Sequence, residues 1–394
     1  MVEKKQECRQ YEFDLAKSIA IVVMVWVHVY EQMSTGFAPS VGNTVAYVVG
    51  SIWLATTFML CMGIGMVYTR HNTAEEYIRR GFNLFTTGFV LLFSREIAPS
   101  VISSVIYSDT SALQYLIYGI SVDILEFAGL AYMLAGLLKK WRIGSTGMLL
   151  ISIFLSIAGT LLEGVQTGNY GIDQILGFFW GTYSESYFPL FNWFIFVAAG
   201  QWFGKKYRDL KDKKRFHLIS LPVGIVVCTA YIYISFNGEQ DVFKGLTSEV
   251  FLAHRPFADA IVCLPINIAL ISLCYFLGKM IPHRAMPLLT HPARHINQYY
   301  CISWVIICVL DYDFCVVHFN TNSEVACWWQ IVLALTIVTV IVYNRYLQKS
   351  VVEFFGKRRT FWIIFIWAVC IGAFVWGLYA YDVHPNLINE YSVD

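Results

Sequence analysis

The feature that most constrains the fold of this chain is a series of apolar blocks, each about twenty residues long, separated by short charged clusters. A bilayer core of roughly 30 Å needs about 20 apolar helical residues per crossing. In lipid, only helices and closed barrels satisfy every backbone amide, and blocks of this length are too long for barrel strands. Of the 394 residues, 57% are hydrophobic and 14% are charged, whereas soluble domains carry about 25% charged residues. The sequence therefore predicts an all-α, polytopic membrane protein.

The apolar blocks predict about eleven transmembrane spans. They lie near residues 14–33, 45–69, 81–106, 114–138, 145–163, 187–204, 217–236, 257–281, 296–318, 325–347 and 361–381. We interpret residues 1–348 as a core of about ten spans. Residues 349–394 then add one more span and an outer tail.

The basic residues predict the orientation of these spans. Of the 28 Lys and Arg, 25 precede or open the first span, or fall after the second, fourth, sixth, eighth or tenth span. Only Arg95, Lys244 and Arg255 fall on the other side. Because loops rich in Lys and Arg stay in the cytoplasm, we expect a cytoplasmic N-terminus and an outer C-terminal tail. A cell-membrane location, plasma or inner, fits this topology.

Several classes of function are disfavoured by composition. The net charge of +1 leaves no basic footprint for nucleic acid. The ten Cys include no Cys-x-x-Cys pair, so we expect no metal site. Cys315 and Cys327 flank a predicted outer loop, and whether they pair stays open. No cleavable signal is expected, since the first apolar block is too long and no small-residue cleavage site follows it.

Four polar side chains lie deep within different predicted spans: His28, Glu126, Asn192 and Asn267. Each is eleven to thirteen residues from the nearest cytoplasmic basic residue, or roughly 16–20 Å along a helix. All four therefore share a level near the bilayer midplane. Polar groups at this depth are costly and point to function.

A histidine and a carboxylate at one depth suit general acid/base chemistry, because the carboxylate would orient the imidazole and stabilise its charged form. Glu126 is the first choice of partner for His28. Asp123, one turn further out, is the alternative, and Glu31 is the third. The opposing interpretation is a set of hydrogen bonds that only pack the helices together.

The outer half of the chain offers candidate acceptor-binding residues. Arg95 and Glu96 in the third span either pair with each other at the outer interface or line the mouth of a cavity. The segment 164–186 is rich in Gly and aromatic residues, among them Trp180. It fits an interfacial aromatic belt or a lip that stacks on a sugar.

Four basic residues lie at the cytoplasmic ends of the early spans: Lys17, Arg70, Arg79 and Arg80. They would suit a polyphosphate donor such as a coenzyme A ester, because Arg and Lys bind phosphates through charge-assisted hydrogen bonds. For any one of these residues, the simpler interpretation is an ordinary topology signal or binding of anionic membrane lipids.

The first span carries a recognisable pattern, in which Asp14 and Lys17 precede His28 and ten residues separate Lys17 from His28. This pattern resembles the opening span of the membrane acyltransferase superfamily, which includes the acyltransferase-three family and the heparan-alpha-glucosaminide N-acetyltransferase relatives. That family usually has Arg at the basic position, and Lys lacks the bidentate fork of Arg. Similar segments follow in order at 58–63, 79–81, 124–130, 187–193 and 295–300.

The resemblance implies transfer of an acyl group, often acetyl, from a cytoplasmic coenzyme A ester to a hydroxyl or amine of a glycan or other acceptor at the outer face. It implies that His28 is the base or a transient acyl carrier, and that the basic residues hold the donor. The catalytic candidates are His28, Glu126, Asp123 and Asn192. The donor-binding candidates are Lys17, Arg70, Arg79 and Arg80. The acceptor-binding candidates are Arg95, Trp180 and Asn267.

A proton-coupled transporter or flippase is the main alternative, since intramembrane His and carboxylates also relay protons. Transporters commonly show paired repeats with broken helices at matching positions, and this sequence shows no such pairing. A receptor-like or scaffolding protein would not need four polar residues at one level. The oligomeric state stays open.

Overall fold

The computed structural model describes residues 10–33, 45, 48–107, 122–183, 186–237, 254–310 and 321–383. Within these ranges every regular element is a helix. The all-α prediction is therefore confirmed. Cys315 lies outside the described residues, as do parts of the fourth and ninth predicted spans.

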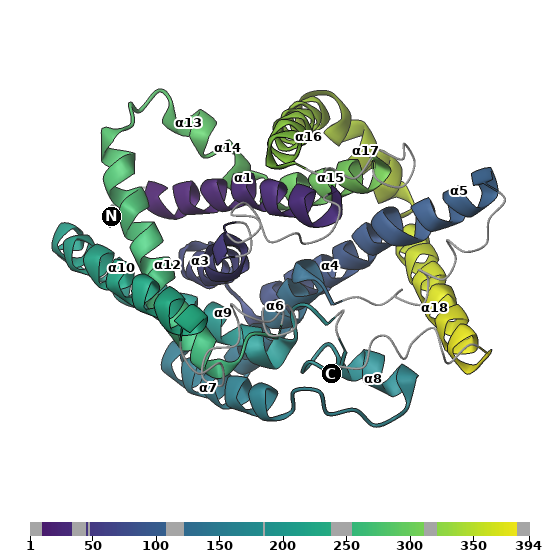
Figure 1. Cartoon of the computed structure of the whole chain (residues 1–394), viewed down its shortest axis with the longest axis horizontal. Coiled ribbons are helices and arrows are strands. Elements are labelled where there is room, and N and C mark those ends of the chain that lie inside the picture. The colour runs from purple at the N-terminus through teal and green to yellow at the C-terminus, as the bar shows by residue number, and fades with distance from the viewer. Residues whose placement is uncertain are drawn as a thin grey trace, which may run out of the picture.

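The helices follow one another along the chain in a bundle, as Figure 1 shows. In order they are α1 (Tyr11–Met33), η1 (Gly50–Leu54), α3 (Ala55–Tyr68), α4 (Ala74–Leu92), η2 (Phe93–Ile97), α5 (Ala98–Tyr107), α6 (Ile124–Lys140), α7 (Ser145–Leu161), α8 (Tyr170–Leu176), α9 (Leu190–Arg208), α10 (Lys213–Asn237), α12 (Phe257–Met280), α13 (Met286–Leu289), α14 (His291–Arg294), α15 (Ile296–Cys308), α16 (Asn322–Val342), η5 (Tyr343–Leu347), α17 (Gln348–Lys357) and α18 (Arg359–Val383).

Each of the eleven predicted spans overlaps a helix in the described residues. Five helical segments there are long and apolar enough to cross a membrane by length and composition: Tyr11–Met33, Lys213–Asn237, Phe257–Met280, Ser323–Lys357 and Arg359–Trp376. Three shorter apolar helices lie at Ile52–Tyr68, Ser145–Leu161 and Ile296–Cys308. The chain is thus a helical membrane protein, while the number of eleven crossings stays a prediction.

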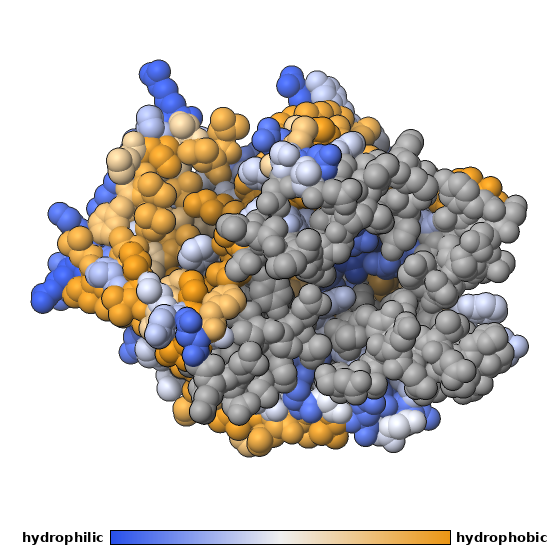
Figure 2. Space-filling view, in the orientation of Figure 1, coloured by the Kyte–Doolittle hydropathy of each residue, from blue (hydrophilic) through white to orange (hydrophobic). Residues whose placement is uncertain are grey.

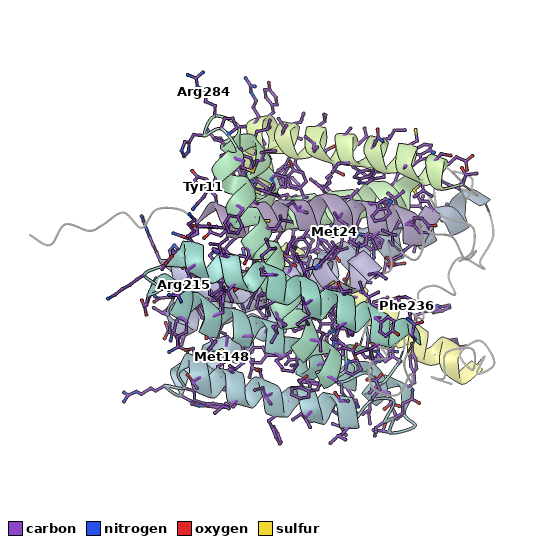
Figure 3. All side chains as sticks on the ribbon, turned by 60° about the vertical axis from the view of Figure 1, so that its left-hand side comes forward. Tyr11, Met24, Met148, Arg215, Phe236 and Arg284 are labelled. Carbon is purple, nitrogen blue, oxygen red and sulfur yellow. The ribbon has the colours of Figure 1, made fainter. Side chains whose placement is uncertain are left out.

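The ends of the helices sort to opposite ends of the bundle. In Figure 3, Tyr11, Arg215 and Arg284 lie at one end, and Phe236 at the far end of α10 lies at the other. Tyr11 opens α1, Arg215 opens α10 and Arg284 follows α12. The sequence placed all three on one side of the membrane, and their common position in the bundle agrees with that alternation.

Helices α4 and α6 form the closest pair near the site, and small residues allow it. A Cβ added at Gly81 of α4 would lie 2.6 Å from the backbone oxygen of Gly129 on α6. Close backbone approach at Gly is typical of helix pairs in membranes. At the start of α4, Thr73 and Glu76 form a capping box, in which each side chain accepts a hydrogen bond from the other residue's backbone. This cap fixes where α4 begins.

The last helix, α18, packs against α4 and η2 at the edge of the bundle (Figure 1). The Trp367 ring lies 4.6 Å from the Phe89 ring, and Arg359 Nη2 donates to Asn83 Oδ1 at 2.9 Å. Most of the remaining surface of α18 is apolar and exposed. Figure 2 shows further apolar surface over α10 and α12, with hydrophilic residues at their tips. A lipid-facing belt explains these surfaces.

Candidate active site

The site is built around two places where regular α-helix stops at depth. Helix α4 changes into a π-helical turn, η2, which carries Arg95. Helix α6 begins at Ile124 and is capped by Asp123. Counted from Arg80 and Lys139, Arg95 and Asp123 lie roughly 22 and 24 Å along their helices. Single π-helical turns are frequent at functional sites.

A buried ion pair joins these two interruptions. Arg95 Nη1 donates to Asp123 Oδ2 at 2.9 Å, and Arg95 Nε lies 2.9 Å from Glu96 Oε1. Arg95 is 6% exposed and Asp123 is 8% exposed. The pairing of Arg95 with Glu96 was one of the two sequence interpretations, and the structure adds Asp123 as a second carboxylate. A guanidinium between two carboxylates offsets much of the cost of burying charge.

A tyrosine from a distant part of the chain completes the polar cluster. Tyr300 of α15 donates its hydroxyl hydrogen to Asp123 Oδ2 at 2.6 Å, the oxygen that also accepts from Arg95. The Ile124 amide donates to Asp123 Oδ1 at 2.6 Å. Both carboxylate oxygens of Asp123 are therefore occupied, so this side chain is held in place as the cap of α6.

His28 of α1 lies beside this cluster, with its ring against aromatic residues. It stacks on Trp304 with ring centroids 4.1 Å apart and an interplanar angle of 30°. The Tyr300 ring meets it edge-on at 6.1 Å. His28 Nδ1 is buried and has no hydrogen-bond partner in the part of the chain that the structure describes. The sequence suggested a carboxylate partner for this ring, whereas the structure gives it an aromatic one.

Glu126 lies one turn into α6 from Asp123 and is 2% exposed. A Cβ on Gly88 of α4 would lie 2.4 Å from its Cδ and Oε1 atoms, so the carboxyl group fills the space that Gly88 leaves. Its Oε2 has no hydrogen-bond partner among the described residues. Buried polar atoms are normally satisfied, so this oxygen is available to a bound group. Glu31, the third choice of partner, is exposed.

Asn192 lies in a different polar region, at the start of α9. It is fully buried, and its Nδ2 donates to the backbone oxygen of Arg255 at 3.5 Å. Its Oδ1 sits where a Cβ on Gly159 of α7 would be, 2.1 Å from that position. These contacts of Asn192 are with α7 and with the segment just before α12.

Asn267 is the centre of a third polar group, which ties α12 to α3. Its Nδ2 donates to Thr56 Oγ1 at 2.9 Å and to the backbone oxygen of Cys263 at 2.7 Å. Its Oδ1 accepts from Thr57 Oγ1 at 2.5 Å. Because its carboxamide is saturated within the protein, these contacts favour a packing role. The four polar residues that the sequence predicted at one depth thus divide among three places.

Basic residues of α4, α6 and α9 lie where α4 begins and α6 ends. Arg80 lies over the Tyr132 ring at 4.8 Å, and Lys139 lies over the Tyr77 ring at 5.0 Å. The pKa of Lys139 is lowered, mainly because burial disfavours its charged form and in second place because the positive charge of Lys205 is near. This arrangement places positive charge, which phosphates can bind, next to two tyrosine rings.

The other donor-binding candidates make no contact with these tyrosine rings that the structure shows in its described residues. Arg70 and Arg79 are exposed. Lys17 Nζ pairs with Asp14 Oδ1 on its own helix at 2.9 Å. Trp180, the aromatic acceptor candidate, donates from Nε1 to the backbone oxygen of Val165 at 3.1 Å. Its indole therefore belongs to the folded segment between α7 and α9.

Sequence reasoning missed Tyr300 and Trp304. Both are aromatic residues inside an apolar span, where such residues are ordinary, and they are separated by one helical turn. The segment 295–300 was recognised only as a similar stretch, so its role beside His28 required the tertiary structure. In the described ranges, no three His, Cys, Asp or Glu side chains are grouped to hold a metal ion.

Comparison with known proteins gives one match. No curated protein and no solved structure matches the chain. The family described as heparan-alpha-glucosaminide N-acetyltransferase, catalytic, matches residues 9–234, which is more than half of the chain. The match covers α1 to α9 and most of α10, and it includes His28, Arg95, Asp123 and Glu126. The chain therefore belongs to the catalytic family of heparan-alpha-glucosaminide N-acetyltransferases, a family of membrane acetyltransferases.

Proposed function

We propose that this protein transfers an acyl group, acetyl in the first instance, from a cytoplasmic acyl-CoA to a hydroxyl or amine of a glycan or similar acceptor at the outer face of the cell membrane. The observation that carries the proposal is the His28 imidazole. It has an unpaired buried nitrogen, lies beside the Arg95–Asp123 pair and occurs in a chain of an acetyltransferase family. A buried base with no structural hydrogen bond is free to exchange a proton with substrate.

In this reaction an imidazole nitrogen of His28 takes the proton of the acceptor hydroxyl or amine as that oxygen or nitrogen attacks the acyl carbon. The new C–O or C–N bond forms and the C–S bond of the donor breaks. The imidazolium then gives its proton to the departing thiolate, so the products are the acylated acceptor and a free thiol. General base help of this kind contributes roughly 10²–10⁴ in rate.

Arg95, Asp123 and Glu126 have different roles in the proposed reaction. Arg95 supplies a fixed positive charge beside the acceptor, and Asp123 holds that guanidinium in place. The unpaired Oε2 of Glu126 accepts a hydrogen bond from the acceptor. Preorganised charges in a site shielded from water stabilise a transition state without reorganisation. Asn192 and Asn267 support the bundle in this scheme.

The donor approaches from the basic end of the bundle. Lys17, Arg70, Arg79 and Arg80 would hold its phosphates, together with Lys139. The alternation of basic loops supports a cytoplasmic position for this end, and in the proposal the acceptor reaches His28 from the opposite end. Non-helical backbone at Val122 and Asp123 supports such access, since backbone of this kind at membrane depth lies in protein or beside water.

Binding of acetyl-CoA to the purified protein tests the donor half of the proposal. We expect saturable binding that weakens about 10-fold or more when Arg79 and Arg80 are both changed to Ala, because each charged hydrogen bond is worth about 1.5–3 kcal/mol. Lys17→Ala should weaken binding less. Lys349→Ala with Lys357→Ala, two basic changes on α17, is the matched control and should leave binding unchanged.

Two results would contradict the proposal. One is the absence of saturable donor binding. The other is proton-driven movement of an unmodified solute across proteoliposomes with no acyl transfer, which would favour the transporter. A panel of amino sugars and neutral sugars, each scored for a labelled acetyl product, would separate amine from hydroxyl acceptors.

A further inference from the structure

Helix α15 lies beyond the part of the chain that the family matches, which ends at residue 234. Nevertheless, it contributes two side chains to the centre of the site. Tyr300 and Trp304 are one helical turn apart, so they share one face of α15. This face meets α1 and η2, and both helices carry residues of the site.

Of the two aromatic rings that contact His28 in the described residues, Trp304 lies closer to it. Its ring stacks on the His28 imidazole at 4.1 Å between centroids. The guanidinium carbon of Arg95 lies 4.6 Å from the same indole. The Trp304 side chain therefore contacts both His28 and Arg95 and links the imidazole to the Arg95–Asp123 pair.

The imidazole of His28 needs such a link because hydrogen bonds do not orient it. In enzymes that use a His base, a carboxylate or carbonyl commonly fixes the ring through its second nitrogen. Here Asp123 is already engaged by Arg95 and Tyr300. No hydrogen bond to His28 occurs among the described residues, and Nδ1 is unpaired. Its ring plane is thus set by flat packing against the indole, an arrangement that aromatic quadrupoles favour.

Tyr300 supports the same arrangement from the preceding turn. Its ring meets His28 edge-on at 72°, and its hydroxyl anchors the site to Asp123 at 2.6 Å. Because Tyr300 is tied to Asp123, the face of α15 that carries Trp304 keeps a fixed position relative to η2 and α6.

We propose that Trp304 is a positioning residue that holds the His28 imidazole at the reactive orientation by ring stacking, and that α15 therefore completes the active site from outside the matched region. The inference rests on the proposed acyl transfer with His28 as base. It assigns no chemistry to Trp304 itself, which acts only through His28.

Variants that remove or preserve a flat ring at position 304 test the proposal in the full-length protein. Trp304→Met and Trp304→Leu remove the stacking surface and should lower kcat about 10- to 100-fold, the scale of a misplaced reacting group, with the donor KM within about 2-fold of wild type. Trp304→Phe keeps a flat ring and should restore kcat to within about 5-fold of wild type.

Trp329→Leu is the matched control. Trp329 Nε1 donates to the backbone oxygen of Val22 at 3.1 Å, so this residue packs on α1 as Trp304 does. No ring contact joins it to His28 in the described residues. Its removal should cost stability yet leave kcat within about 3-fold of wild type, since it holds no reacting group.

The outcomes separate the inference from the proposed function. Full kcat in Trp304→Met or Trp304→Leu, with His28→Ala inactive, would overturn the positioning role and leave the acyltransferase intact. An equal loss in Trp329→Leu, or a Trp304→Phe variant no better than Trp304→Leu, would reduce Trp304 to general packing and also overturn it. No acyl transfer by the wild type would instead contradict the proposed function.

Discussion

Arg95 donates a 2.9 Å hydrogen bond to Asp123, and this contact joins the π-helical turn η2 to the cap of α6. Arg95→Gln would leave a buried carboxylate without its cation, and loss of one partner of a buried pair costs on the order of 3–5 kcal/mol. Thermal unfolding in detergent should show a large fall in the midpoint.

Asp123→Asn is the informative comparison with Arg95→Gln. It keeps Glu96 as a partner of Arg95 and keeps an acceptor oxygen for Tyr300. We expect a smaller loss, about 1–3 kcal/mol. Unfolding midpoints equal to wild type in both variants would contradict the view that this pair holds η2 against α6.

Gly88→Ala tests the position of Glu126. The added Cβ would lie 2.4 Å from the Glu126 carboxyl group, so that group or the α4–α6 pair must shift. Overpacking of this kind costs typically 1–3 kcal/mol, and acyl transfer should fall with the displaced carboxylate. Gly65→Ala on α3 meets nothing within 4 Å and should be neutral or stabilising by up to about 1 kcal/mol. Equal unfolding midpoints and equal acyl transfer in the two variants would argue against the close contact between Gly88 and the Glu126 carboxyl group.

Asn267→Leu separates the packing role that the structure favours from the acceptor-binding role predicted from sequence. Loss of the Asn267 carboxamide leaves the Thr57 hydroxyl without its partner, at a cost of about 1–3 kcal/mol. We expect a lower unfolding midpoint and an unchanged acceptor KM. A raised acceptor KM at unchanged stability would restore the acceptor role.

The stability that the capping box adds at the start of α4 should depend on pH, because it involves the Glu76 carboxylate. Hydrogen bonds from Thr73 and then His71 lower the pKa of Glu76 from 4.5 to about 2. A carboxyl group whose folded pKa is depressed adds stability that is complete above its ordinary pKa and is lost as pH falls through the folded value. The difference in unfolding midpoint between wild type and Glu76→Gln should therefore be constant near neutral pH and shrink between pH 4.5 and 2. A difference that is independent of pH in that window would refute the capping role.

Much of the architecture could be predicted from the sequence because lipid imposes a simple rule. Apolar blocks of sufficient length must be helices, and each predicted block overlaps one. The sequence predicted one continuous span over residues 81–106 and did not predict the π-helical turn at Arg95, since such a turn has no strong sequence signal. The beginning of α6 at Ile124 was also missed, because the apolar block continues on both sides of Asp123.

The site was predicted only in part, for a physical reason. Depth along a helix can be counted from basic residues, and this count predicted polar residues far from the basic ends of their helices. Rotation about the helix axis cannot be counted in that way. Asn192 therefore faces Gly159 and Arg255, and Asn267 faces Thr56 and Thr57, while His28 faces α15. Tyr300 and Trp304 required the tertiary contacts.

Acyl transfer by the His28→Ala variant tests the central claim most directly. Purified protein would be given radiolabelled acetyl-CoA and an acceptor, with donor binding and labelled product measured on the same samples. The account predicts that His28→Ala binds acetyl-CoA as wild type does and forms product at least about 10²-fold more slowly. Product formation at the wild-type rate by that variant would contradict it.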